Sequence, residues 1–181
     1  WTGRNEKKGL GVLTKKDDFF VDECHNKDLI NFIPIRSDNL KLLGVWSFNH
    51  RASKFGSNVS GNTIDAINFY RDWFGNDNEK CIVAGDFNNS IIWDKKGNAN
   101  NFNNINDHFL DLGFVSNYHK LEGESFGKES SATFFHTKME SKKYHIDYIY
   151  SKNLNPLEFK VGSYSEWISY SDHSPLIAKL G

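Results

Sequence analysis

Short apolar runs, each bordered by Gly, Asn, Asp or Ser, follow one another along most of the chain. Runs of this kind that are rich in β-branched and aromatic residues are typical of β-strands. The pattern predicts strands at residues 9–15, 19–23, 29–36, 40–48, 80–87, 131–137, 144–151, 159–164 and 174–180.

Two segments between these runs have helical spacing instead. Residues 61–75 gather Ile64, Ile67, Phe69, Tyr70 and Phe74 mostly on one side, with Asn62 or Thr63 as the N-cap and Gly75 as the C-terminal stop. Residues 105–113 carry a weaker stripe of Ile105, Phe109 and Leu112 that ends at Gly113, and an Asn-rich loop at 97–106 leads into them. Many strands with few helices between them predict an α+β sandwich whose strand ends share one rim.

Composition narrows the class of protein. A chain of 181 residues fits one domain, and a formal net charge of −1 argues against broad electrostatic attachment to nucleic acid or anionic lipid. A phosphate-handling protein with this balance needs a local positive charge, such as a bound divalent cation. Cys24 and Cys81 form no CxxC pair, and no apolar run approaches the roughly 20 residues of a membrane span. We therefore expect a soluble, cytoplasmic protein with no zinc site, no disulfide framework and no membrane partner.

The first candidate for chemistry is the stretch CIVAGDFNNS, residues 81–90, which begins as a buried strand and turns polar at its end. Side chains two apart on a strand point to the same face, so Asp86 and Asn88 can reach one point beyond it. A carboxylate and an amide there suit the binding of a cation, a water or a phosphate oxygen. A second interpretation stays open, in which both residues only cap a turn.

Two further polar clusters follow along the chain. In HIDYIY, His145 and Asp147 alternate with apolar residues. If Asp147 points into the core, its carboxylate must be paired, hydrogen-bonded or metal-bound. In the alternative interpretation, both residues lie on the solvent face and have no functional role. In SDHSP, Asp172 and His173 suit an acid that orients an imidazole. Ser171 and Ser174 could also suggest a serine hydrolase, but the sequence contains no G-x-S-x-G motif.

The order GDFN, HIDYI, SDHSP closely resembles the carboxyl-terminal two thirds of the endonuclease/exonuclease/phosphatase superfamily, the fold of DNase I and exonuclease III. The likeness extends to KGLGVL, LLGVW, VSNYH and ATFF, and so over nearly the whole chain. It implies a single domain over residues 1–181, built as a two-sheet, four-layer α/β sandwich. It also implies hydrolysis of phosphodiesters or phosphomonoesters with Mg²⁺ or Mn²⁺, most simply as an endonuclease or exonuclease.

The resemblance also assigns roles to residues of this chain. Asp86 looks like the carboxylate that orients or deprotonates the attacking water, and Asn88 like the group that holds a phosphate oxygen. His173 resembles the imidazole that contacts the scissile phosphate. Asp147 resembles the acid that is paired with a site histidine, or one that lies just behind the catalytic residues. Asp172 looks like a metal-site carboxylate. Asn49 and His145 are the expected substrate-binding residues.

Two departures from the family keep other functions open. Trp46 stands near the place where members often carry a Tyr or His, and His50 is a substitute candidate. The family's first strands, with an Asn and a metal-binding Glu, have no counterpart, so we expect an N-terminally truncated domain. The alternatives are a small-molecule phosphatase, a lipid phosphodiesterase or a non-catalytic binding module.

Nucleic acid or another phosphoester is the expected substrate, and several residues could contact it. The basic candidates are Lys7, Lys8, Lys15, Lys16, Lys138, Lys142 and Lys143. The aromatic candidates for stacking on bases are Trp1, Trp46, Trp93 and Trp167, although aromatic residues in strands are usually core.

Overall fold

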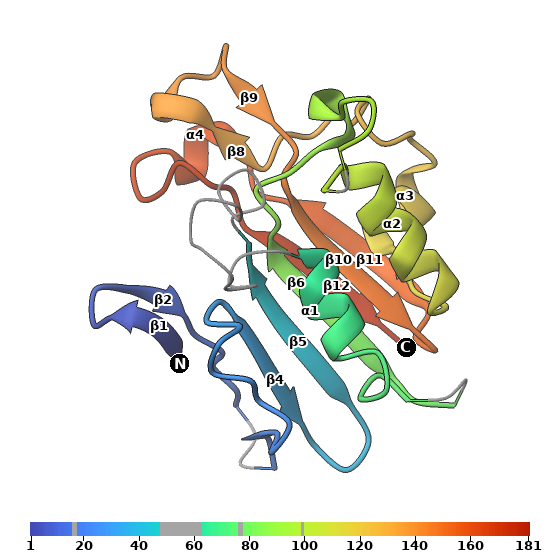
Figure 1. The fold of residues 1–181 in the computed structure, drawn as a ribbon. Coiled ribbons are helices and arrows are strands. Elements are labelled where there is room, and N and C mark those ends of the chain that lie inside the picture. Colours follow the sequence, from blue (N-terminus) through green and yellow to red (C-terminus); the bar gives the residue numbers. More distant parts are fainter. Residues whose placement is uncertain (16–17, 48–62, 76–77, 99) are drawn as a thin grey trace.

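A six-stranded mixed sheet forms the centre of the molecule in the computed structural model, which describes residues 1–15, 18–47, 63–75, 78–98 and 100–181 (Figure 1). The strand order is β3-β4-β5-β6-β10-β7. These strands span Phe20–Val21 (β3), Phe32–Arg36 (β4), Lys41–Trp46 (β5), Cys81–Asp86 (β6), Asp147–Lys152 (β10) and Val115–Ser116 (β7). β5 and β6 are parallel, and every other neighbouring pair is antiparallel.

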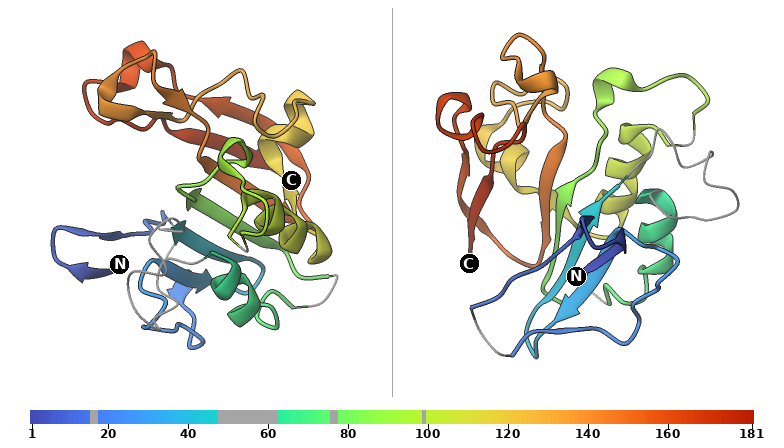
Figure 2. Two further views of the ribbon diagram at one scale, coloured as in Figure 1. Left: turned by 45° about the horizontal axis from the view of Figure 1, so that its top comes forward. Right: turned by 90° about the vertical axis from the view of Figure 1, so that its left-hand side faces the viewer.

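Alternation along the central strands builds the apolar face of this sheet. Leu43, Val83 and Tyr150 occupy one cross-strand row, and all three are buried. Helices α1 (Thr63–Phe69) and α2 (Phe102–Asp111) contact each other and cover this face (Figure 2). Buried residues of these helices and of the turn after α1 belong to the same core as the sheet residues: Ile67, Tyr70, Phe74, Phe102, Ile105 and Phe109. This packing fixes the central strands, because an interior at crystal-like density tolerates little movement.

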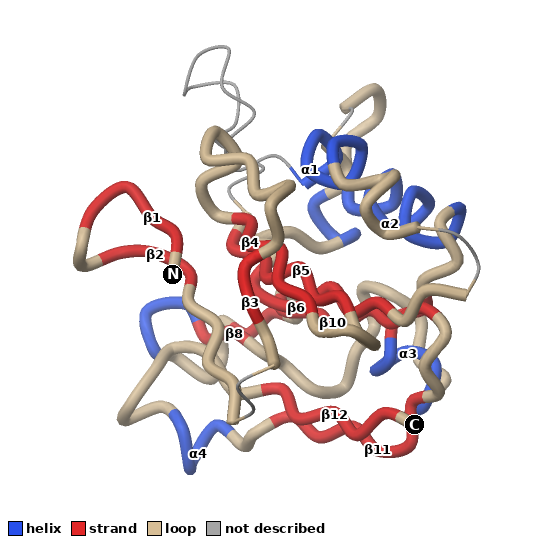
Figure 3. Tube along the Cα trace, turned by 90° about the horizontal axis from the view of Figure 1, so that it is seen from below, coloured by secondary structure: helices blue, strands red, loops and turns tan. Residues whose placement is uncertain are grey.

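A second layer of β-structure lies on the other face of the central sheet. It is the antiparallel pair β11 (Pro156–Val161) and β12 (Leu176–Leu180), and α3 (Asn117–Glu122) contacts both β10 and β11 (Figure 3). Two short antiparallel pairs complete the strands: β1 (Thr2–Asn5) with β2 (Lys8–Leu10), and β8 (Phe134–Phe135) with β9 (Lys143–Tyr144). The remaining turns are α4 (Tyr164–Trp167) and the 3₁₀ helices η2 (Ile91–Trp93) and η3 (His136–Lys138). In the described part of the chain, the helices all fall short of the length and apolarity that a membrane span requires.

The predicted α+β arrangement with two sheets is confirmed, while several element bounds differ. The run at 9–15 pairs only as far as Leu10, and 131–137 contributes only Phe134 and Phe135 as strand. The helix expected at 105–113 begins earlier, at Phe102, because the Asp94 carboxylate accepts hydrogen bonds from the backbone N–H groups of Phe102 and Asn103 (2.6 and 3.0 Å). Gly113 adopts left-handed backbone (φ +83°) directly after the C-cap of α2, as expected for a helix stop, whereas α1 ends at Phe69 and turns connect it to Gly75.

Candidate active site

The pairing of β6 with β10 places two carboxylates opposite each other. Asp86 and Asp147 are direct cross-strand partners at the end of the antiparallel ladder. The next residue, Phe87, donates its backbone N–H to the carbonyl of Ile146 (2.9 Å), and its buried ring packs edge-on against Tyr148. Like charges directly opposite on a sheet repel, so this placement needs a compensating partner.

Asn88 holds the Asp86 carboxylate in a tight turn. Its backbone N–H donates to Asp86 Oδ1 and its side-chain Nδ2 donates to Asp86 Oδ2, both at 2.8 Å. The turn requires left-handed backbone at Asn88 (φ +46°), a conformation that Asn tolerates better than most residues. Nδ2 also donates to the carbonyl oxygen of Ser47 (3.0 Å), the residue that follows β5. The two residues therefore converge through a turn rather than through strand alternation.

Gly85 allows β6 to approach β5 at this point. Its backbone is in the region that favours glycine (φ +143°), and a Cβ at this position would lie 1.9 Å from the carbonyl oxygen of Val45. No other residue fits such an approach without moving a strand. The glycine thus belongs to the architecture that places Asp86.

Asp147 connects to an imidazole and a buried hydroxyl. His173 Nδ1 lies 3.0 Å from Asp147 Oδ2 and 3.2 Å from Oδ1. Thr133, which is fully buried, donates its hydroxyl to Asp147 Oδ2 (2.6 Å) and accepts the backbone N–H groups of Ile146 and Asp147 (3.0 and 3.1 Å). The carboxylate thereby fixes the ring of His173 and leaves Nε2 as the nitrogen directed away from it.

Backbone contacts hold the SDHSP segment against β8. The carbonyl of Asp172 accepts the N–H of Phe135 (2.8 Å), and the N–H of Ser174 donates to the carbonyl of Thr133 (2.8 Å). Phe134 forms an isolated bridge with His173, and the two rings lie 4.7 Å apart. His173 is therefore positioned from both its backbone and its ring.

The electrostatics of the cluster follow from burial and the two facing carboxylates. Burial, together with the charge of Asp147, raises the pKa of Asp86 to about 7, against the opposing effects of His173 and of the hydrogen bonds from Asn88. Burial alone would lower the pKa of His173, but the hydrogen bond to Asp147 and the charges of Asp147, Asp86 and Asp172 raise it overall. The site therefore holds more negative charge than it neutralises, and it attracts a cation or a proton.

The donor set fits a divalent metal ion. Asp86, Asp147 and His173 each offer a ligand atom, and these atoms all lie within 4.8 Å of one another. Carboxylate oxygens are the preferred ligands of Mg²⁺ and Mn²⁺, and imidazole is compatible with Mn²⁺. A cation among them would relieve the repulsion that raises the pKa of Asp86.

The solved structures that are similar to this chain include a 3′-5′ exonuclease, a 3′ phosphatase and an endonuclease/exonuclease/phosphatase. A 3′-5′ exonuclease from Neisseria meningitidis has a TM-score of 0.63 at 17% identity, covering 90% of this chain and 70% of its own. A 3′ phosphatase from Neisseria, bound to a product DNA hairpin, has a TM-score of 0.62 at 18% identity, covering 83% of this chain and 64% of its own. An endonuclease/exonuclease/phosphatase from Beutenbergia cavernae has a TM-score of 0.58 at 9% identity, covering 90% and 44%.

The chain has the endonuclease/exonuclease/phosphatase fold. It spans from 44% to 70% of the length of these three chains. No protein-family model and no curated protein matches the sequence. At these identities the likeness concerns the fold, and the function has to be argued from the site.

Two other predicted site residues, Asp172 and His145, do not join the trio of Asp86, Asp147 and His173. Asp172 is half-buried and influences the pKa of His173, but it is not among the converging ligand atoms. His145 is buried between Tyr118 and Tyr148, with Nδ1 2.8 Å from the carbonyl oxygen of Ser131. Asn49 and His50 lie outside the described residues. The roles of Asp172, His145 and Asn49 stay predictions.

The sequence did not predict three residues that contact or position the site: Thr133, Gly85 and Ser47. Thr133 lies in the ATFF stretch that contributed to the resemblance, but a Thr within a strand-like run gives no sign of a buried carboxylate partner. The role of Gly85 could have been predicted, since a Gly within a strand-like run indicates that another backbone approaches closely.

Proposed function

We propose that this chain is a divalent-metal-dependent phosphoesterase that hydrolyses phosphodiester bonds of nucleic acid. The observation that carries the proposal is the convergence of Asp86, Asp147 and His173, with His173 hydrogen-bonded to Asp147. In-line attack on a phosphate needs an oriented oxygen nucleophile and positive charge against the phosphate oxygens. The neighbouring structures, a 3′-5′ exonuclease and a 3′ phosphatase bound to a DNA hairpin, support this class of reaction.

Each residue has a distinct part in the proposed reaction. Asp86 accepts a hydrogen bond from the attacking water and is the group placed to take its proton. His173 presents Nε2 to a phosphate oxygen, and Asp147 keeps Nδ1 protonated and the ring aligned. The raised pKa of His173 favours the charged imidazolium, which is the form that stabilises negative charge on the phosphate.

Asn88 donates hydrogen bonds to both carboxylate oxygens of Asp86. Both hydrogens of its amide are engaged, one by Asp86 and one by the carbonyl of Ser47. A contact from Nδ2 to a phosphate oxygen would therefore replace one of these bonds. We assign Asn88 as the residue that orients Asp86, with the phosphate contact formed when substrate displaces the Ser47 bond.

The carboxylates of Asp86 and Asp147 would hold the metal ion, since His173 as an imidazolium has no free lone pair for it. A bound Mg²⁺ or Mn²⁺ would supply charge against the developing negative charge on phosphate. Carboxylate oxygens suit Mg²⁺ and Mn²⁺ alike.

Cleavage of labelled single- and double-stranded oligonucleotides in Mg²⁺ or Mn²⁺ tests the proposal, with p-nitrophenyl phosphate as the phosphomonoester. We expect wild-type cleavage that EDTA abolishes, and a loss of at least about a hundredfold in Asp86→Asn, the range of a catalytic acid–base group. Asp111→Asn, an exposed carboxylate at the end of α2, is the matched control. Equal cleavage by wild type and Asp86→Asn would refute the assignment, and hydrolysis of the monoester alone would favour a phosphatase.

A further inference from the structure

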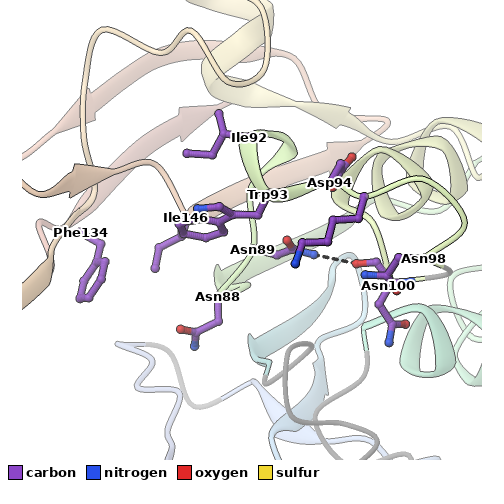
Figure 4. A pocket seen from close by; sticks show the side chains of 10 residues that line it. Asn88, Asn89, Ile92, Trp93, Asp94, Asn98, Asn100, Phe134 and Ile146 are labelled. Atoms are coloured by element: carbon purple, nitrogen blue, oxygen red, sulfur yellow. Dashed lines mark hydrogen bonds between the residues drawn. The ribbon is translucent and has the colours of Figure 1, made fainter.

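A pocket of about 700 Å³ opens beside the trio, on the loop that follows β6. Asn88 and Phe134 line it, and Phe134 is the ring that packs against His173. Figure 4 shows its apolar residues Ile92, Trp93, Ile146 and Phe134 on one side and Asn98 and Asn100 on the other. The volume lies within the range of small-ligand sites.

Trp93 is the largest apolar side chain that lines this pocket. Its side chain is 42% exposed, and the neighbouring Ile92 is 52% exposed. The indole packs against Tyr144 (ring centroids 5.1 Å apart), Tyr144 stacks with Phe134 (6.4 Å), and Phe134 contacts His173. A continuous series of rings therefore leads from Trp93 to the imidazole. Exposed apolar side chains in a concave surface beside a polar cluster indicate a binding site.

The loop that carries Trp93 is braced from several directions. The buried side chain of Asn89 donates to the carbonyl of Asn100 (3.0 Å), and the backbone N–H of Trp93 donates to the carbonyl of Ser90 (3.0 Å). Asn101 bonds both the N–H and the carbonyl of Lys95 (2.9 and 2.7 Å). These bonds fix the backbone that carries Trp93, and Tyr144 packs against its indole, so less order has to be gained when a ligand binds.

The polar side of the pocket has uncommitted hydrogen-bonding groups. Within the described ranges, the side-chain amide of Asn100 and the ammonium of Lys95 have no hydrogen-bond partner. Amides can both donate and accept, as the edge of a nucleobase requires, and the lysine can contact a phosphate. An aromatic platform with amide and ammonium groups is the chemistry that single-stranded nucleic acid uses.

We infer that this pocket binds a nucleobase flanking the scissile phosphate, with Trp93 as the stacking platform. The inference rests on the proposed phosphodiesterase function and specifies its substrate. A base reaches the indole only when it is not stacked within a duplex, so the substrate is single-stranded nucleic acid or a frayed end. Trp93 then determines specificity through binding, while the trio performs the reaction.

Steady-state kinetics on minimal substrates tests this directly. The substrates are a thymidine dinucleotide and its two analogues in which one sugar or the other carries no base. All three keep both sugars and the phosphate, so a pocket for sugar or phosphate would not distinguish them. We expect wild type to show a KM about tenfold higher for one analogue, the low end of what stacking of one base contributes.

Variants separate stacking from structure. Trp93→Ala should raise the KM for the dinucleotide about tenfold, with a smaller change in kcat, and leave the poorer analogue unchanged. Trp93→Phe should retain much of the affinity. Trp167→Ala is the matched control, because Trp167 is similarly exposed (39%) and does not line the pocket. Equal KM values of wild type for all three substrates, or an equal effect of Trp93→Ala on all three, would overturn the inference.

A binding measurement distinguishes this inference from the proposed function. Titration of the dinucleotide in EDTA, followed by the NMR signal of the Trp93 indole N–H, requires no catalysis. A shift of that signal with the dinucleotide, absent with one of the two analogues that lack a base, supports the subsite even if wild type cleaves nothing. An unchanged indole signal in a protein that cleaves the dinucleotide would remove the subsite and leave the phosphodiesterase intact.

Discussion

Asp86 and Asp147 face each other across the β6–β10 ladder, so the protein places two carboxylates where a sheet would normally avoid them. Asn88 bonds the first, and Thr133 and His173 bond the second. These bonds hold the pair in position but do not remove the cost of burying its charge, since the pKa of Asp86 still rises to about 7. The first two predictions below follow from this repulsion, and the others from the contacts that hold the two carboxylates in place.

Asp86→Asn should stabilise the metal-free protein at pH 8. The folded pKa of about 7 lies above the ordinary value of 3.8, so the folded state binds the extra proton. Stability from this group is highest below pH 4 and is lost as pH rises towards and through 7, by roughly 2–4 kcal/mol. The raised pKa of His173 acts in the same direction, because its stabilising charge is lost as pH rises through its folded value.

Urea denaturation in EDTA between pH 4 and pH 8 measures this effect. The gain of Asp86→Asn over wild type should grow with pH across that range, and Asp111→Asn should follow wild type. A gain that is constant with pH would mean that the Asp86 charge is not the cause.

Mn²⁺ should stabilise wild type more strongly at pH 8 than at pH 5.5. Protons and the cation compete for Asp86, whose pKa of about 7 lies between these values. The increase in Tm at 1 mM Mn²⁺ should be largest for wild type and much smaller for Asp147→Asn. The same increase in both proteins would place the ion elsewhere.

Thr133→Val should weaken both stability and activity. The buried hydroxyl serves Asp147 and two backbone N–H groups, which would lose their acceptor. We expect a loss of roughly 1–3 kcal/mol in the free energy of unfolding, the usual cost of stranded buried polar groups. Without the Thr133 hydroxyl, Asp147 should move away from His173, and the pKa of His173 measured by NMR should fall. Thr133→Ser should restore most of the stability and the activity. A normal His173 titration in a destabilised variant would limit Thr133 to a structural role.

Gly85→Ala should destabilise the protein by about 3 kcal/mol or more. The methyl group would collide with the carbonyl of Val45, and the strained φ adds its own cost. Gly97→Ala is the control, because Gly97 also has positive φ (+80°) but no atom lies within 4 Å of its Cβ position. Its cost should stay near 1 kcal/mol, the usual cost of left-handed backbone in a non-glycine residue. Denaturant midpoints of the two variants give the comparison, and equal midpoints would contradict the packing argument.

The sequence predicts the fold class and the central residues of the site because both depend on local patterns. Apolar runs mark β5, β6 and β10, and polar residues at their ends mark Asp86, Asn88 and Asp147. The turn interpretation of GDFN is confirmed, since Asn88 caps Asp86, while the binding role of the two residues stays a prediction.

The sequence pattern could not decide which polar residues converge. Alternation placed His145 beside Asp147, but β10 begins only at Asp147, and His145 turns into a buried aromatic cluster, where burial lowers its pKa. The partnership of Thr133 with Asp147 and the approach of Gly85 to Val45 are long-range contacts. Such contacts depend on tertiary packing, which local propensity does not encode.

The trio is drawn from three segments that are distant in the chain: the end of β6, the start of β10 and the turn before β12. A cation on Asp86 and Asp147, beside His173, can bind only after these segments have closed on one another, late on the folding route, since distant closures are entropically costly. Ligation would then hold the finished fold rather than guide its formation. Mn²⁺ should accordingly slow the unfolding limb of a chevron plot and leave the refolding limb nearly unchanged, so that the ion prolongs the lifetime of the native state.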